Sequence, residues 1–216
     1  MNKLKKIIKK NFKWIIFLVV IIIFIAIAED VFEKEIFEFD EIIYNFFVNH
    51  RSNTLNTFFK AITKLGNAMV ILTLTILCVI FIKDKKYKIL VPTNIITIIG
   101  LNILLKNIFV RPRPNQFRII EETGYSFPSG HAMASTAFYG LLIYIAYKKI
   151  QNKTLRNTIC IMLIVLILII DISRIYLGVH YTSDVVAGTC LSIAYLIIIT
   201  KISSIFDKWP YFSMVT

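Results

Sequence analysis

Six apolar stretches divide this sequence of 216 residues, and each is long enough, or nearly long enough, to cross a lipid bilayer. Their approximate limits are residues 13–28, 65–82, 89–110, 131–147, 158–175 and 185–200. A helix needs about 20 mostly apolar residues for such a crossing. The composition agrees, because 57% of the residues are hydrophobic and only 18% are charged, which is unusual for a soluble domain. The sequence therefore predicts an all-α fold: a polytopic membrane protein built as a bundle of six transmembrane helices.

The first apolar stretch follows six lysines and ends in Ala26, Ile27 and Ala28, a pattern that also suits a signal peptide. Because the apolar run from Phe12 is about long enough to span a bilayer, we expect an uncleaved first helix. In either case the chain leaves the cytoplasm at this point. We find no internal repeat and no low-complexity linker, so the prediction is a single membrane-embedded domain over residues 1–216.

Residues 29–64 connect the first two stretches and alternate acidic and apolar side chains at helical spacing. This pattern is typical of an amphipathic helix that lies on the membrane surface. We therefore expect an interfacial helix between spans 1 and 2, with a packing and covering role.

The net charge of +12 raises the question of nucleic acid as a partner. The basic residues, however, gather between the apolar stretches, as topology signals do, so we expect a lipid bilayer and its anionic lipids, and no nucleic acid. With the N-terminus in the cytoplasm, the basic clusters within 83–88, 148–156 and 201–208 are cytoplasmic, as the positive-inside rule requires.

With this orientation, several basic residues lie in the outer loops, where the positive-inside rule predicts few of them. An ionisable cluster at the membrane is a functional-site hypothesis by default. The loop from Lys106 reads KNIFVRPRPNQFRIIEETGYSFPSGH and the loop from Ser173 reads SRIYLGVHYTSD. We expect the following residues to converge in one pocket: Lys106, Arg113, His131, Arg174, His180 and Asp184.

The cationic side chains of this set indicate phosphate as the ligand, because arginine offers a planar fork that fits phosphate oxygens. Ser129 and Gly130 stand where span 4 should begin, and a helix N-terminus adds backbone N–H donors. Pro128 suits the first helical turn, since it has no N–H to satisfy there.

Two histidines can divide the chemistry of phosphoryl transfer. His180 precedes Asp184 by four residues, a spacing that places both side chains on one face of a helical turn. The carboxylate can then hold one ring nitrogen and leave the other free to attack phosphorus. His131 can protonate the departing oxygen and later activate water.

At this point the sequence resembles a known family. Lys106-x6-Arg113-Pro114, then Pro128-Ser129-Gly130-His131, then Ser173-Arg174-x5-His180-x3-Asp184 is similar to the three-part signature of the type 2 phosphatidic acid phosphatase superfamily, the membrane lipid phosphatases related to vanadium haloperoxidases. The signature covers residues 106–184. Arg111-Pro112 is an alternative register for the first part, but the spacing favours Arg113.

The resemblance implies a role for each matching residue. It implies phosphate coordination by Lys106, Arg113, Ser129, Gly130 and Arg174, with His131 as acid and base, His180 as nucleophile and Asp184 as its partner. It also implies no metal, no other cofactor, six membrane helices, and a site that faces the periplasm or the extracellular space. For a bacterial protein, the location would be the inner membrane.

The expected substrate is a membrane lipid phosphate. Undecaprenyl diphosphate is the first choice, because the chain has little beyond six spans and the site faces the side where that lipid is released. Phosphatidylglycerophosphate, diacylglycerol pyrophosphate, phosphatidic acid and lipid A phosphates are alternatives, as is transfer to a hydroxyl acceptor instead of water. An anion or lipid transporter is a non-enzyme alternative. Arg111 and Arg118 either draw in the head group or are solvated loop charges.

Overall fold

The computed structural model describes residues 2–34 and 37–206, and the side chains of 11–34 and 37–205. These residues form eight α-helices and one short 3-10 turn, with no β-strand among them. The helices are α1 (Asn2–Phe32), α2 (Glu38–Asn49), α3 (Asn53–Thr63), α4 (Ala68–Phe81), α5 (Lys85–Phe109), α6 (Gly130–Lys149), α7 (Lys153–Tyr176) and α8 (Thr182–Phe206), and the turn η1 (Lys64–Gly66) joins α3 to α4. The prediction of an all-helical fold is confirmed.

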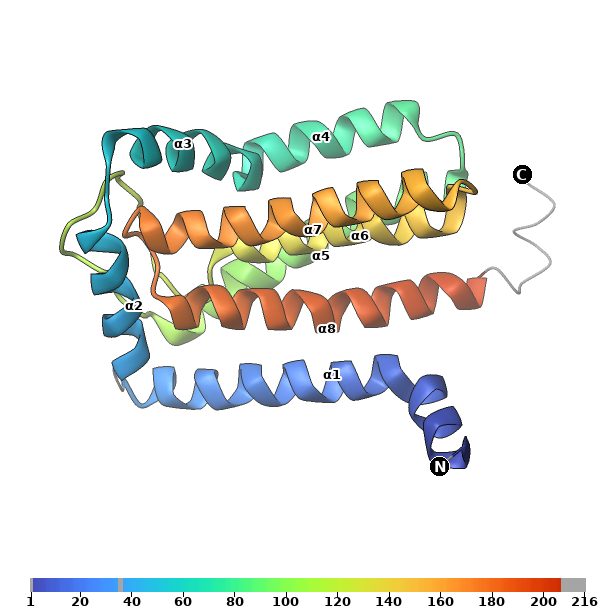
Figure 1. Cartoon of the computed structure of the whole chain (residues 1–216), viewed down its shortest axis with the longest axis horizontal. Helices are drawn as coiled ribbons and strands as arrows, with labels where there is room; N and C mark the ends of the chain where they lie inside the picture. The colour runs from blue at the N-terminus through green and yellow to red at the C-terminus, as the bar shows by residue number, and fades with distance from the viewer. Residues whose placement is uncertain (1, 35–36, 207–216) are drawn as a thin grey trace.

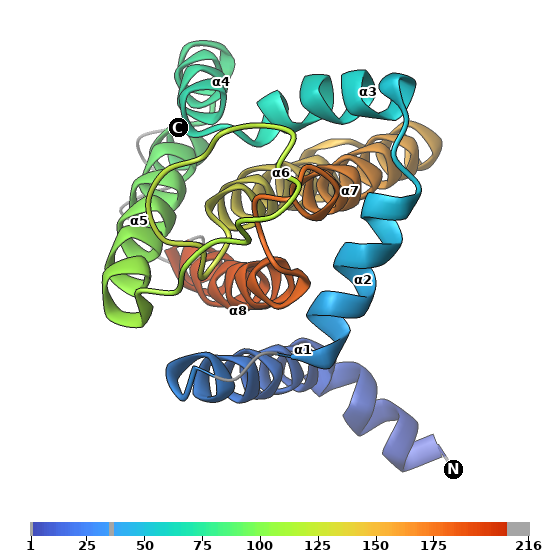
Figure 2. The same cartoon turned by 90° about the vertical axis from the view of Figure 1, so that its left-hand side faces the viewer.

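Helix α6 is the centre of the bundle. It packs against α4, α5, α7 and α8, and α1 lies along the outer side of α8; Figure 2 shows this arrangement from one end. The first half of α6 carries small side chains, and Ala132, Ala134 and Ala137 are buried. Small residues let neighbouring helices approach closely, so this part of the sequence suits a helix that is surrounded by others.

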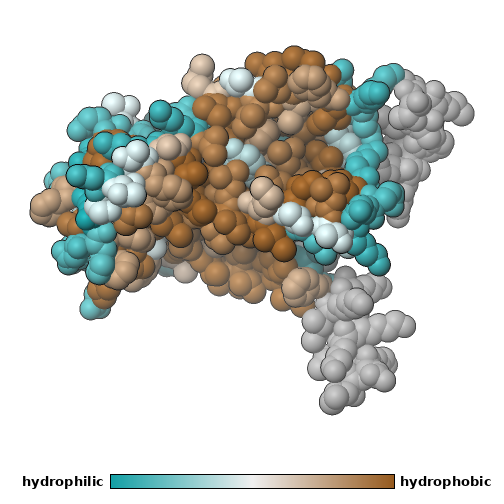
Figure 3. Space-filling model, turned by 45° about the horizontal axis from the view of Figure 1, so that its top comes forward, coloured by the Kyte–Doolittle hydropathy of each residue, from teal (hydrophilic) through white to brown (hydrophobic). Residues whose placement is uncertain are grey.

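Four helices are long and apolar enough to cross a membrane: the 11–32 part of α1, then α5, α7 and α8. The α3–η1 segment and α4, bent by 50° at their junction, make a fifth if the two together form one span. Six spans were expected, and α6 is the one that does not qualify by composition. The reason is its central place, because a helix that faces other helices needs fewer strongly apolar side chains than one that faces lipid. On the face that Figure 3 shows, an apolar region lies between two more polar ends.

The expected interfacial helix over residues 29–64 is divided in the structure. Helix α1 continues to Phe32, residues 35–36 lie outside the described residues, and α2 and α3 follow as separate helices. Ser52 causes the second break, since its side chain accepts a hydrogen bond from the Leu55 backbone N–H and so caps the start of α3. Helix α2 lies across one end of the bundle (Figure 1) and packs there through Ile43 and Phe47.

The two ends of the bundle differ in character. The α4–α5 and α6–α7 connections and the last residues of α8 lie at one end, and they carry the basic clusters of 83–88 and 148–156 together with Lys201. Lys208 lies outside the described residues. The loop from 110 to 129 and the α7–α8 connection lie at the other end, beside α2. The candidate site residues come from that second end.

Candidate active site

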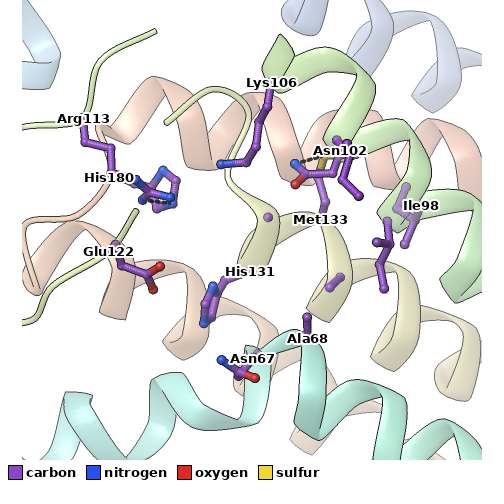
Figure 4. A pocket seen from close by; sticks show the side chains of 15 residues that line it. Asn67, Ala68, Ile98, Asn102, Lys106, Arg113, Glu122, His131, Met133 and His180 are labelled. Atoms are coloured by element: carbon purple, nitrogen blue, oxygen red, sulfur yellow. Dashed lines mark hydrogen bonds between the residues drawn. The ribbon is translucent and has the colours of Figure 1, made fainter. Parts of the chain in front are cut away.

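A cavity of about 350 Å³ lies where α5, α6 and the 110–129 loop meet the start of α4. Its polar side chains come from segments far apart in the sequence, and Figure 4 shows them pointing toward a common space. One wall is apolar and is formed by α4 and α5 through Ala68, Ile98, Ile99 and Ile103. The polar lining residues are Asn67, Asn102, Lys106, Arg113, Glu122, His131 and His180.

Arg113 is fixed at the mouth of the cavity by the loop that carries it. Its Nε donates to the Gly124 carbonyl at 3.0 Å, and its Nη2 donates to the Thr123 carbonyl at 3.0 Å. Its Nη1 lies 2.9 Å from the Val179 carbonyl and 2.9 Å from His180 Nε2. Because a guanidinium can only donate, His180 Nε2 accepts this bond through its lone pair.

The other ring nitrogen of His180 must then carry the proton. Nδ1 lies 3.3 Å from Asp184 Oδ2 and donates to it. The same carboxylate oxygen accepts the Tyr181 backbone N–H at 2.9 Å. Both side chains are buried, with 1% and 0% of their residues' surface exposed. Asp184 therefore holds His180 in the tautomer whose Nε2 is unprotonated, and in this structure that lone pair accepts the hydrogen bond from Arg113.

The electrostatic surroundings keep His180 neutral. Burial lowers the pKa of His180 well below its usual value, and the nearby charges of Arg174, Arg113 and Lys106 lower it further. A neutral imidazole keeps one unprotonated nitrogen that can act as a nucleophile, whereas an imidazolium has none.

His131 lines the same cavity from the first turn of α6. Gly66 of η1 lies against it: a Cβ atom at Gly66 would come within 3.2 Å of His131 Cδ2 and 2.6 Å of Ile170 Cγ2. The absence of a side chain at this glycine thus gives the imidazole of His131 its place. Figure 4 shows His131 and His180 on different sides of the cavity.

The start of α6 differs from the expectation in two respects. The helix begins at Gly130 with Ser129 as its N-cap, so Pro128 precedes the cap and is not in the first turn. The Ser129 backbone N–H donates to the Asp184 carbonyl at 3.0 Å, and its Oγ accepts from the Ala132 N–H. Ser129 is fully buried and ties α6 to α8, while Gly130 does line the cavity.

Two further cations of the predicted set approach the cavity in different ways. Lys106 lines it and donates to the Tyr125 carbonyl. Arg174 is 1% exposed and lies behind it, where Nη1 donates to Thr63 Oγ1 at 2.6 Å and Nη2 pairs with Glu122 Oε1 at 2.5 Å. Glu122 itself lines the cavity. Its carboxylate thus occupies the side of Arg174 that faces the cavity.

Arg111 is a buried part of the site, although a solvated loop charge was one of the two interpretations of its sequence position. Its Nη1 lies 2.6 Å from Asp184 Oδ1 and its Nη2 lies 3.1 Å from Asp40 Oδ2. The backbone N–H of Ser183 donates to Asp40 Oδ1 at 2.7 Å. Arg111 and Asp40 are 9% and 1% exposed. One guanidinium therefore links α2 to the carboxylate that is bonded to His180.

Of the eight residues predicted for the site, five line the cavity and three support it from behind. The lining residues are Lys106, Arg113, Gly130, His131 and His180, and the supporting residues are Ser129, Arg174 and Asp184. Sequence reasoning missed Glu122 and Asn102, although both lie between or beside the signature motifs. It also missed Asp40, whose place in an acidic amphipathic segment gave no sign of burial.

The donor set of the cavity is cationic and imidazole-rich. Within the described part of the chain, no three His, Cys, Asp or Glu side chains are grouped so that they can hold a metal ion. The arrangement is suited to an anion.

The chain belongs to the PAP2 superfamily, since residues 86–207 match the model of that family. Two relatives match most of its length. It is 29% identical to phosphatidylglycerophosphatase B of Bacillus subtilis, over 79% of this chain and 86% of the relative. It is also 29% identical to undecaprenyl-diphosphatase of Sulfolobus acidocaldarius, over 85% of this chain and 87% of the relative. The predicted family is confirmed, and with it the prediction of a membrane phosphatase.

Solved structures show the same fold. The transmembrane PAP2-type phosphatidylglycerolphosphate phosphatase of Bacillus subtilis superposes with a TM-score of 0.79 and 26% identity, covering 92% of this chain and 99% of that one. LpxE of Aquifex aeolicus superposes with a TM-score of 0.63 and 26% identity, covering 76% and 96% of the two chains.

Proposed function

We propose that this protein hydrolyses a lipid phosphate or diphosphate through a phosphohistidine intermediate on His180. One observation carries the proposal: Asp184 fixes the tautomer of His180, whose unprotonated Nε2 accepts a hydrogen bond from Arg113, and His180 lines a cavity together with His131 and Lys106. A nucleophile, an oriented base and cationic donors around one space are the parts that phosphoryl transfer requires.

The reaction has two steps in this proposal. When Arg113 transfers its N–H bond from His180 Nε2 to the phosphate, Nε2 attacks phosphorus and forms the P–N bond. The bond from phosphorus to the lipid or phosphate oxygen breaks, and His131, which enters this step as the imidazolium, gives that oxygen its proton. His131 then takes a proton from water, the water oxygen attacks phosphorus, and the P–N bond breaks to release inorganic phosphate. Asp184 keeps the Nδ1 proton in place and stabilises the positive ring, as the carboxylate does in a catalytic triad.

Phosphate coordination is assigned to the cations and to the start of α6. Arg113 and Lys106 reach the cavity directly, and Gly130 offers a backbone N–H at the helix N-terminus. Arg174 joins them once Glu122 gives way to the more highly charged phosphate. Ser129 acts by fixing the first turn of α6 against α8. In this proposal the reaction needs no metal ion or other cofactor.

The substrate is proposed from the cavity and the relatives. The apolar wall formed by α4 and α5 suits the first part of a lipid tail, because such a tail gains from leaving water. Undecaprenyl diphosphate is the first candidate, supported by the similarity to an undecaprenyl-diphosphatase over 85% of the chain. Phosphatidylglycerophosphate is the second, supported by the TM-score of 0.79 with a phosphatidylglycerolphosphate phosphatase.

We also propose six membrane spans, with α6 as the inner one, α2 at the interface, and a cytoplasmic N-terminus in a bacterial inner membrane. The basic clusters gather at the bundle end opposite the cavity, and the positive-inside rule assigns that end to the cytoplasm. The cavity then faces the periplasm or the cell exterior.

A panel assay tests the function. Purified protein is given undecaprenyl diphosphate, phosphatidylglycerophosphate, phosphatidic acid and lipid A, each with and without a chelator, and released phosphate is measured. We expect chelator-resistant activity with a clear preference for one of the first two lipids, and none with His180→Ala. Activity that a chelator abolishes, or that survives His180→Ala, contradicts the mechanism. A lipid acceptor added to the same assay separates hydrolysis from phosphate transfer.

A further inference from the structure

A second cavity, of about 360 Å³, lies at the end of the bundle opposite the catalytic cavity, between α1, α6 and α8. Three lysines from three different helices line it: Lys13 of α1, Lys148 of α6 and Lys201 of α8. None of the lining residues that the structure describes is acidic. The mechanism proposed above does not use this cavity.

The three lysines have no counter-charge of their own among the described residues. The neighbouring Lys149 shows the contrast, because its Nζ lies 2.6 Å from Asp84 Oδ2 in an ion pair. Among the side chains that the structure describes, no acidic group forms such a pair with Lys13, Lys148 or Lys201. Three like charges around one space repel each other unless an anion joins them, so the cavity has the chemistry of an anion site.

The surroundings of the cavity indicate where its ligand comes from. Trp14 is part of the lining and is 46% exposed, and its neighbours Phe12 and Ile15 are 56% and 41% exposed on the apolar side of α1. Tryptophan with an exposed apolar neighbourhood is typical of the boundary between lipid tails and head groups. A ligand here has its charge near the lysines and its apolar part beside Trp14.

We propose that this cavity binds the phosphodiester head group of an anionic membrane phospholipid in the leaflet opposite the active site. A lipid supplies both halves of the recognition, because its phosphate meets the lysines and its acyl chains lie along α1. Basic pockets between helices on the cytoplasmic side are suited to such head groups. The bound lipid then links α1 near Lys13 to α8 near Lys201. The packing of α1 against α8 holds α1 onto the bundle.

The positive-inside rule accounts for lysines at this end of the bundle, but it does not require them to share a cavity. Lysines that obey the rule without lining the cavity are therefore the matched control. Lys83, Lys88 and Lys153 are exposed at the same end and lie outside the lining.

Trp14 is a natural reporter, because the chain has two tryptophans and the other is Trp209. In a Trp209→Phe background, quenching of Trp14 fluorescence is measured in vesicles of phosphatidylcholine that contain either brominated phosphatidylglycerol or brominated phosphatidylcholine. We expect about a tenfold preference for the anionic lipid, given roughly fivefold for each lysine near a membrane surface and partial solvent screening.

The lysine variants show whether the preference for the anionic lipid comes from the cavity or from basic charge in general. The triple variant Lys13→Gln, Lys148→Gln, Lys201→Gln is expected to reduce the preference to about twofold or less, and the triple variant Lys83→Gln, Lys88→Gln, Lys153→Gln to retain most of it. Lys201→Gln alone should reduce it by a few-fold, which provides a result even if the triple variant does not fold. Both triple variants are expected to keep phosphatase activity in phosphatidylcholine.

Three results overturn the proposal. The first is equal quenching by the two brominated lipids in the parent protein. The second is an equal loss of preference in the two triple variants. The third is displacement of the brominated lipid by millimolar inorganic phosphate, which would make the cavity a site for a free anion.

Discussion

Arg111 and Asp184 form a buried ion pair behind the candidate active-site cavity, with Arg111 Nη1 2.6 Å from Asp184 Oδ1. The second oxygen of the same carboxylate faces His180 Nδ1 at 3.3 Å, and the second Nη of the same guanidinium holds Asp40 of α2. The orientation of His180 therefore depends on a residue of the loop and, through it, on the docking of α2.

Replacement of Arg111 is expected to lower both stability and turnover. Arg111→Met leaves Asp40 and Asp184 buried without a cation, which costs about 3–5 kcal/mol when a buried pair loses one partner. We expect kcat to fall by about 10- to 100-fold as the imidazole of His180 loses its alignment. The stability and kcat of Arg111→Lys should lie between those of the parent protein and Arg111→Met, because an ammonium cannot bridge two carboxylates as a planar guanidinium does.

Phosphate release and the apparent melting temperature in detergent measure the two effects. Arg156→Met is the control, since Arg156 stacks on Tyr147 at the other end of the bundle. If Arg111→Met behaves like Arg156→Met, the link from α2 to Asp184 has no role in catalysis.

Gly66→Ala is expected to impair His131 specifically. Its Cβ would lie 2.6 Å from Ile170 Cγ2 and 3.2 Å from His131 Cδ2, so the imidazole has to move. With p-nitrophenyl phosphate, whose leaving group needs no proton, formation of the phosphoenzyme should persist while its hydrolysis slows by about 10- to 100-fold. A burst of p-nitrophenol followed by a slow steady rate is the expected observation.

The control for this substitution is Gly100→Ala. No atom lies within 4 Å of a Cβ at Gly100 of α5, so this change should leave the kinetics unchanged and stabilise the helix by about 0.5–1 kcal/mol. Loss of the burst in Gly66→Ala, or equal kinetics in the two variants, would argue against the role of His131 in the second step.

Glu122→Gln is expected to strengthen inhibition by inorganic phosphate. In the structure the carboxylate of Glu122 pairs with Arg174 at 2.5 Å, and it competes with phosphate for the same guanidinium. Removal of that charge should lower the inhibition constant of phosphate by roughly three- to tenfold, a modest factor because Glu122 is partly exposed. Competition assays against a lipid substrate measure the constant. An unchanged or higher value would show that Arg174 does not reach bound phosphate.

The stability of the protein should fall with pH because of His180. Its pKa is lowered in the folded state by burial and by Arg174, Arg113 and Lys106, whereas in the unfolded chain a histidine titrates near about 6.5. Below about pH 6.5 the unfolded state therefore binds a proton at His180 that the folded state does not bind. The contribution of His180 to the free energy of unfolding is complete above about pH 7. It is lost as the pH falls below about 6.5, at about 1.4 kcal/mol per pH unit.

Melting temperatures of the phosphate-free protein between pH 7.5 and 5 test this sign. His180→Gln should show a smaller decrease than the parent protein. A steeper decrease in His180→Gln would mean that His180 is charged in the folded protein.

Much of the fold could be predicted because bilayer crossing requires long apolar stretches, and these are visible in the sequence. The limits of α5, α7 and α8 lie within a few residues of the predicted spans at one end and extend beyond them at the other. The inner position of α6 could not be predicted, because hydropathy does not tell whether a helix faces lipid or other helices. The break at Ser52 depends on a single cap, which the amphipathic pattern of residues 29–64 obscured.

The lining of the site was predictable because topology brings the two outer loops to one end and the motifs limit the residue types. The roles of the residues that lie behind the lining could not be predicted. Arg111 and Arg113 are two residues apart in an extended loop, and only their contacts distinguish the one that faces Asp184 from the one that faces His180 Nε2. Asp40 is 71 residues from Arg111 in the chain, a separation across which spacing gives no information.

Direct detection of the phosphoenzyme is the measurement that tests the central claim most closely. The protein is mixed with lipid substrate labelled in the reacting phosphate, quenched within the first turnover, and digested for peptide mapping. We expect an acid-labile, base-stable label on His180 and none in His180→Ala. With labelled p-nitrophenyl phosphate, whose leaving group needs no proton, we expect a longer-lived label in His131→Ala. A label on another residue, or turnover without any label in His131→Ala, would contradict the phosphohistidine mechanism.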